Sequence, residues 1–100
     1  MSELLVKSSF DPYLNEKFEI HSESGDKLEV ELVEVSDHSN EHIDGFSVIF
    51  RGPLENVFHQ DTYKVTHNKM GEISLFLGPI IYGKTDATYY ESVFSRLKEK

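Results

Sequence analysis

The chain is 100 residues long, carries a formal net charge of −8 from 18 acidic and 10 basic residues, and contains no cysteine. This length predicts one domain with one hydrophobic core. The acidic balance argues against nucleic acid as a partner, because affinity for phosphates comes from Lys and Arg, and it argues equally against an anionic membrane surface. The lack of cysteine excludes disulfides and thiolate chemistry.

The N-terminal segment does not have the features of a signal peptide. Residues 1–9 hold only a short apolar run and place Glu3 where a signal peptide needs a basic residue. No stretch of the chain approaches the length that spans a membrane. We therefore expect a cytoplasmic protein with a flexible N-terminal tail over residues 1–9 and a single β-barrel-like domain over residues 10–97. Alternatively, Leu4, Leu5 and Val6 could add an edge strand to the sheet.

A short helical turn is expected at the start of this domain, over Ser9–Leu14. Pro12 suits the first position of a helix, where its missing N–H costs no hydrogen bond. Phe10, Leu14 and Phe18 follow one another at four-residue spacing. We expect these three side chains to share a face and to plug an open end of the sheet.

Alternating apolar residues predict six β-strands, each ended by turn residues. In the second strand the apolar alternation changes parity between Leu32 and Val33. A strand cannot change faces without an extra residue, so we infer a β-bulge near Leu32–Glu34 that bends the strand around a barrel corner. The expected strands cover residues 17–23, 27–36, 45–51, 61–67, 72–77 and 88–97.

The predicted fold class is all-β: a six-stranded antiparallel meander that forms a small closed or nearly closed barrel, with a short N-terminal helical turn. In a meander the third and fifth strands run parallel to each other. Gly52-Pro53 and Gly78-Pro79 follow these two strands, and proline cannot donate to a ladder. Both strands should therefore end at the same rim, which carries the loops 52–60 and 78–87.

These two loops contain more large apolar side chains than loops usually do, and exposed apolar surface is tolerated only in small patches. The side chains either pack together as a lid or meet a partner, and the sequence leaves both alternatives open. The simplest partner is a second copy of the chain. The residues of the candidate interaction rim are Leu54, Phe58, His59, Ile81, Tyr82 and Arg51.

Three histidines are candidate metal ligands. His38 and His42 flank Glu41 in a polar loop between the second and third strands. His67 ends the fourth strand, which in a meander reaches the same end of the sheet as this loop. These groups could ligate zinc if the loop folded over. A mobile loop cannot hold ligands in place without supporting hydrogen bonds, so we expect no metal site.

Two further arrangements have a functional and a structural interpretation. Tyr63 and His67 are four residues apart on one strand, so their side chains share a face. They could act as an acid–base pair, or their polar ends could form structural hydrogen bonds at the barrel mouth. Arg51 is either a fork for a carboxylate or phosphate ligand or part of a salt bridge to Glu91 or Glu72. We favour the structural interpretation of both, and neither a nucleophile motif nor a phosphate-binding loop is present.

Several segments taken in order resemble a small bacterial all-β domain family of unknown function. Met70 and Gly78 depart from the residues usual in that family, which are Leu and Val. The resemblance brings no activity, cofactor or catalytic residue, and it implies only an accessory role in a phage-tail-like assembly. The segments that carry it are Phe10–Leu14, Phe46–Pro53, Gln60–His67, Met70–Pro79 and Tyr90–Phe94.

The function we expect is that of a non-enzymatic protein-interaction or structural module, with a protein partner or a second copy of the chain as its ligand. The alternative is a small-ligand-binding barrel that uses the rim formed by loops 52–60 and 78–87. A six-stranded barrel is normally filled by its own side chains, which disfavours an internal ligand cavity. We expect no catalytic residue, no cofactor and no metal.

Overall fold

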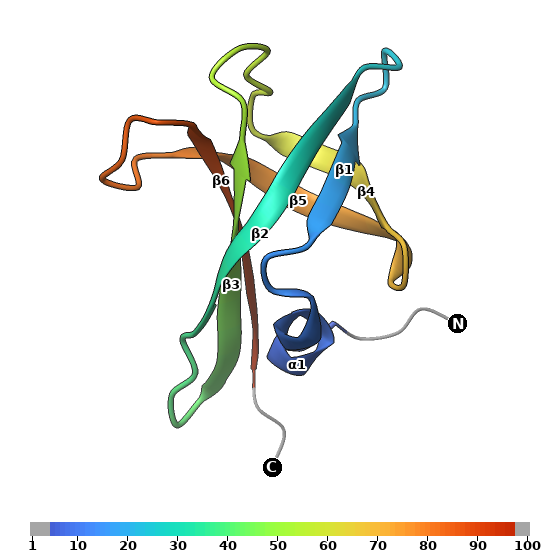
Figure 1. Cartoon of the computed structure of the whole chain (residues 1–100). Coiled ribbons are helices and arrows are strands. Elements are labelled where there is room, and N and C mark those ends of the chain that lie inside the picture. The colour runs from blue at the N-terminus through green and yellow to red at the C-terminus, as the bar shows by residue number, and fades with distance from the viewer. Residues whose placement is uncertain (1–4, 98–100) are drawn as a thin grey trace.

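The segments of alternating apolar residues fold into six strands that follow a short helical segment (Figure 1). The structure is a computed structural model and describes residues 5–97. Met1–Leu4, which belong to the predicted tail, lie outside the described residues. The elements are α1 (Lys7–Phe10), the 3₁₀ turn η1 (Asp11–Tyr13), β1 (Lys17–His21), β2 (Lys27–Asp37), β3 (Ile43–Gly52), β4 (Asp61–His67), β5 (Gly71–Ile80) and β6 (Thr88–Leu97).

The strands form a closed antiparallel barrel in the order β1-β2-β3-β6-β5-β4, with β4 paired back to β1. The predicted barrel is confirmed, but the simple meander order is wrong, because β3 pairs with β6 and not with β4. Strands β4, β1, β2 and β3 lie side by side in the order of a Greek key. The loop 53–60 allows this order because it is longer than the hairpin loops of about two to five residues that join adjacent strands.

Strand β5 pairs with two neighbours in succession. Gly71–Leu77 pair with β4, and Gly78–Ile80 pair with β6. The prediction that Gly78-Pro79 ends this strand is therefore wrong, since the strand continues to Ile80. At the change of partner, a Cβ on Gly78 would lie 2.7 Å from Cβ and 3.0 Å from Cα of Gln60, which leaves space only for glycine.

The predicted β-bulge is confirmed. The register of the β2–β3 ladder shifts between Leu32 and Glu34, so Val33 is the extra residue. Leu32 is buried in the barrel, whereas Val33 packs against a second group of apolar side chains outside the main core. The bulge therefore lets β2 contribute to two separate clusters.

The barrel interior is filled by the inward side chains of the strands, and Phe10 of α1 closes one end. The Phe10 ring is fully buried and lies 5.9 Å from the rings of both Phe46 and Phe94. Leu14 does not join this plug, because the backbone leaves the helical region at Leu14. The helix begins at Lys7, inside the segment predicted as a tail. The main core consists of Phe10, Phe18, Ile20, Leu28, Val30, Leu32, Phe46, Val48, Phe50, Tyr63, Val65, Leu75, Leu77 and Tyr90.

A smaller apolar cluster, separate from the main core, surrounds Ile49 and Tyr89. Both side chains are buried, although Ile49 alternates with the inward residues of β3. This cluster joins the loop 81–87 to β2, β3 and β6, and its members are Ile49, Ala87, Tyr89, Val33, Ile80 and Tyr82. Within residues 5–97, no helix has the length and apolar character needed to cross a membrane.

Gly78→Ala tests the close approach at the change of partner of β5. We expect this substitution to lower the free energy of unfolding by roughly 1–3 kcal/mol, as overpacking typically does. Chemical denaturation measures the change, and Ser74→Ala at an exposed position of β5 is the control. Equal stability of the two variants would show that Gln60 moves away without cost.

Candidate functional site

Three loops leave the barrel at the same end, which we call the loop end (Figure 1). They span residues 22–26, 53–60 and 81–87. Strands β3 and β5 both run antiparallel to β6, so the two loops that follow them leave in the same direction, as the sequence predicted. The residues of the candidate interaction rim come from these two loops and from the end of β3.

The loop 53–60 is held down on the barrel by Phe58. The Phe58 ring lies 5.4 Å from the Tyr63 ring, and its backbone N–H donates a 3.1 Å hydrogen bond to the Tyr90 hydroxyl. The Tyr63 hydroxyl in turn donates a 2.6 Å hydrogen bond to the backbone oxygen of His59. Burial raises the pKa of both tyrosines. Phe58 thus acts as a lid residue, while Leu54 remains 59% exposed.

The loop 81–87 is fixed by Tyr82. Its ring stacks on Tyr89 at 4.5 Å, and its hydroxyl donates a hydrogen bond to Glu34 of β2. Glu34 also accepts a 2.6 Å hydrogen bond from the Ser36 hydroxyl. The hydrogen bond to Glu34 raises the pKa of Tyr82 to about 12. The pKa of Glu34 is lowered, first by Ser36 and then by Tyr82.

Arg51 forms the predicted ion pair, but with a different carboxylate from the two expected. Its Nη2 lies 3.0 Å from Oδ2 of Asp86, not against Glu91 or Glu72. Arg51 lies opposite Tyr89 in the β3–β6 ladder, so the loop before β6 brings Asp86 within reach. The hydrogen bond from Arg51 lowers the pKa of Asp86, which also accepts a 3.0 Å hydrogen bond from the Tyr89 hydroxyl. The guanidinium therefore fastens the loop 81–87 to β3.

The two anchored loops leave three large apolar side chains in solvent. Ile81 is 100% exposed, Leu54 is 59% exposed and Val57 is 53% exposed. A hollow of about 340 Å³ lies between the loops 22–26 and 53–60 and is lined in part by Val57 and His59. No residue of the loop 81–87 lines this hollow.

The histidines considered as ligands lie in separate places. His67 is buried between the rings of Tyr13 and Phe18, and its Nε2 lies 2.8 Å from Oε1 of Glu16. His38 lies 2.9 Å from the Ser47 hydroxyl. In the described part of the chain, no group of three or more potential metal ligands occurs.

Tyr63 and His67 also do not form the pair considered from the sequence. The Tyr63 hydroxyl bonds to His59 at the loop end, whereas the His67 ring bonds to Glu16, just before β1 at the other end of the barrel. The two residues share the inward face of β4, as their spacing indicates, but their polar atoms point to opposite ends. Each has a structural partner.

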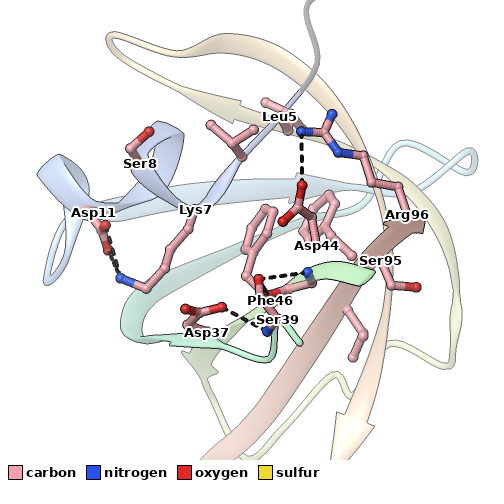
Figure 2. A pocket seen from close by; sticks show the side chains of 14 residues that line it. Leu5, Lys7, Ser8, Asp11, Asp37, Ser39, Asp44, Phe46, Ser95 and Arg96 are labelled. Carbon is pink, nitrogen blue, oxygen red and sulfur yellow. Dashed lines mark hydrogen bonds and ion pairs between the residues drawn. The ribbon is translucent and has the colours of Figure 1, made fainter. Parts of the chain in front are cut away.

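A groove at the other end of the barrel has no counterpart among the predictions made from the sequence. This groove has a volume of about 660 Å³ and lies between Leu5–Ser8 and the ends of β3 and β6 (Figure 2). Lys7 pairs with Asp11 at 3.1 Å, and Arg96 pairs with Asp44 at 3.9 Å across its wall. The only signal in the sequence was the outward apolar residues of β6, which alternate with its inward ones.

Comparison with known families identifies the relatives of the chain. Residues 5–94 match the family described as domain of unknown function (DUF6916). The chain belongs to this family. The resemblance to a small all-β family of unknown function is thereby confirmed, and the match covers both anchored loops and most of the groove. Searches of curated proteins and of solved structures find no match.

The pKa of the Glu34 carboxyl group tests whether the loop 81–87 is anchored, because the hydrogen bonds from Ser36 and Tyr82 lower it. The folded-state pKa lies below the ordinary value of 4.5, so the carboxylate stabilises the fold above that pH, and this contribution is lost as the pH falls through the folded pKa. We expect Ser36→Ala to raise the pKa of Glu34 more than Tyr82→Phe does, because Ser36 is the larger cause.

Carbon-13 NMR titration of the Glu34 carboxyl group measures both shifts. Ser74→Ala, at an exposed position of β5, should leave the Glu34 pKa unchanged. If neither Ser36→Ala nor Tyr82→Phe moves it, the chain of hydrogen bonds does not form in solution and the loop 81–87 is not anchored in this way.

Proposed function

We propose that the chain is a non-enzymatic protein-interaction module that binds a partner protein through its loop end. One observation carries this proposal: Ile81 is 100% exposed beside anchored neighbours, and Leu54 and Val57 are more than half exposed at the same end. Soluble proteins rarely leave large apolar side chains grouped in solvent without an interaction to make. An accessory role in a phage-tail-like assembly, which the resemblance implies, would provide such a partner.

The rigidity of the loops supports this proposal. Arg51 and Asp86 hold one loop to β3, and the Tyr90 hydroxyl holds the backbone of the other at Phe58. Preorganised loops lose little conformational entropy when they bind, so more of the interaction energy appears as affinity. The exposed apolar side chains would therefore act as anchors on a fixed platform.

The polar residues of the domain support a non-enzymatic role. His67, Tyr63 and His38 are each bonded to a residue that holds them in a structural position. Among the described residues, every buried side-chain nitrogen or oxygen has a hydrogen-bond partner. These three side chains are thus engaged in contacts that hold the fold together, which favours a structural role for them.

The alternative function, a small-ligand-binding barrel, has one observation in its favour. The hollow of about 340 Å³ at the loop end is lined by Val57, Phe58 and His59 on one side and by polar residues of the loop 22–26 on the other. Its size lies at the lower limit of the range of about 300–1,000 Å³ that is typical of ligand sites. A ligand there would contact loop 53–60 but not loop 81–87.

Site-specific photo-crosslinking in cells of the source organism tests the proposed function. A photoreactive residue at Ile81 or Leu54 should give the same partner adduct, and one at the exposed Lys69, in the turn between β4 and β5 at the other end of the barrel, should not. We expect Leu54→Ser/Val57→Ser/Ile81→Ser to remove that adduct without lowering the melting temperature.

The opposite outcome is equally clear. If the adducts at Ile81 and Lys69 are the same, or if the triple variant keeps its partner, the loop end is not an interaction surface. A crosslinked adduct of twice the mass of the chain, formed from the photoreactive residue at Ile81, would identify the partner as a second copy bound at the loop end.

A further inference from the structure

Strand β6 has one edge that is fully paired and one that is mostly open. It pairs with β3 along its whole length, from Thr88 to Leu97. On the other side it pairs with β5 only at Tyr89–Glu91. Beyond Glu91, β5 bends away, and the side-chain hydroxyl of Ser92 bonds to the backbone oxygen of Phe76 instead.

The hydrogen bonds of Gly45 show which backbone groups of β6 point to the open side. The C=O of Gly45 accepts from His38 N–H at 2.8 Å, and its N–H donates to the Ser39 hydroxyl at 3.1 Å, so both groups point away from β6. Gly45 lies opposite Ser95, which makes this a non-hydrogen-bonded pair of the β3–β6 ladder. The N–H and C=O of Ser95 therefore point away from β3.

Pro79 leads independently to the same assignment. Proline has no N–H to donate, and Pro79 lies opposite Tyr90 in the β5–β6 ladder. Tyr90 must therefore direct its backbone groups to β3, and because direction alternates along a strand, the odd-numbered residues of β6 direct theirs outward. The outward groups beyond the β5 ladder are those of Val93, Ser95 and Leu97, which we call the β6 edge.

The β6 edge has no strand beside it among residues 5–97. It borders the groove of about 660 Å³ that separates it from Leu5–Ser8 (Figure 2). The side chains of Val93 and Leu97 are 62% and 77% exposed. An open edge with apolar side chains is a template for another strand, and natural proteins usually block such edges with charge, proline or a covering element.

We propose that the β6 edge pairs with the β6 edge of a second copy of the chain, antiparallel and about a twofold axis at Ser95. This pairing places Ser95 opposite Ser95 of the second copy and Val93 opposite Leu97 of the second copy. Every outward N–H and C=O of the edge then gains a partner, and the apolar side chains meet across the strands. Such a contact is isologous and closes at a dimer.

The distribution of charge favours the second copy as the occupant. The chain as a whole carries −8, but Val93–Leu97 contain no carboxylate. The one charged side chain in this stretch, Arg96, lies 3.9 Å from Asp44. Two of the three carboxylates that line the adjoining groove, Asp11 and Asp44, are ion-paired with Lys7 and Arg96. Repulsion between two chains is therefore weak where the edges meet, and added salt should strengthen the dimer by screening the remaining acidic residues. This dimer is independent of the loop end, which lies at the opposite end of the barrel.

Light scattering over a range of protein concentrations, with Ser95→Pro and Ser95→Ala, tests the proposal. The wild-type chain should show twice the mass of the monomer at high concentration. Proline at Ser95 removes an outward N–H but no bond to β3, and should weaken the dimer by at least about tenfold. Ser95→Ala keeps the N–H and should dimerise like the wild type.

A second variant keeps the test decisive if Ser95→Pro does not fold. Val93→Lys/Leu97→Lys places lysines opposite each other across the proposed pair, yet moves the net charge of the chain towards zero. It should abolish the dimer, although general repulsion between the chains is reduced. A strictly monomeric wild type, or a dimer that survives the double lysine variant, overturns the proposal.

Discussion

The ladder between β5 and β6 has three residue pairs, as has the β1–β4 ladder, and its position along β6 determines where the loop end and the β6 edge lie. β5 reaches β6 after it has finished its pairing with β4, and it changes partner at Gly78, where Gln60 leaves no space for a side chain. On the side of Gly78 that faces away from the loop end, the two strands separate. The Ser92 hydroxyl satisfies the carbonyl of Phe76 where the ladder ends, so the departure of β5 leaves that group bonded.

On the loop-end side of the β5–β6 ladder, the chain enters the loop 81–87, which would project freely without further contacts. The extra residue in β2, Val33, contributes to the apolar cluster that receives Tyr82 and Ile80. Glu34 then faces the Tyr82 hydroxyl, and Arg51 holds Asp86 at the other end of the loop. The loop is fixed while Ile81 remains outside, and this combination supports an interaction role for the loop end.

On the other side of the ladder, away from the loop end, the separation of β5 and β6 leaves one edge of β6 unpaired among residues 5–97. The helical segment fills the inner side of this opening with Phe10, which packs against Phe46 and Phe94. It does not extend a strand along β6, so a groove remains between them. The short β5–β6 ladder thus leaves the open edge at one end, while contacts with β2 and β3 fix the loop 81–87 at the other.

The local features of this fold could be predicted from the sequence, because they depend on neighbours along the chain. Alternation located the strands, and the change of parity after Leu32 located the bulge. The choice of neighbouring strands could not be predicted in this way, since an inward Phe50 fits beside β4 or β6 equally well. Meander order, the simplest choice, contains neither the β3–β6 ladder nor the open edge.

The predictions of individual side-chain contacts were wrong for a related reason. Leu14 has helical spacing from Phe10, but the chain leaves the helix there and Leu14 remains exposed. The partner of Arg51 depends on the β3–β6 register, which no pattern within one strand reveals. The rim residues were placed at the correct end of the barrel, but which of them are anchors and which are exposed follows from contacts with β2, β4 and β6.

Amide hydrogen exchange of β6 in dilute, monomeric protein tests the central claim most directly. If one edge of β6 is paired with β3 and the other is open, the amides of Phe94 and Arg96 exchange slowly, while those of Val93, Ser95 and Leu97 exchange rapidly. Slow exchange at Val93 and Ser95 in the dilute monomer would contradict the account, because it would show that the edge is already covered within a single chain.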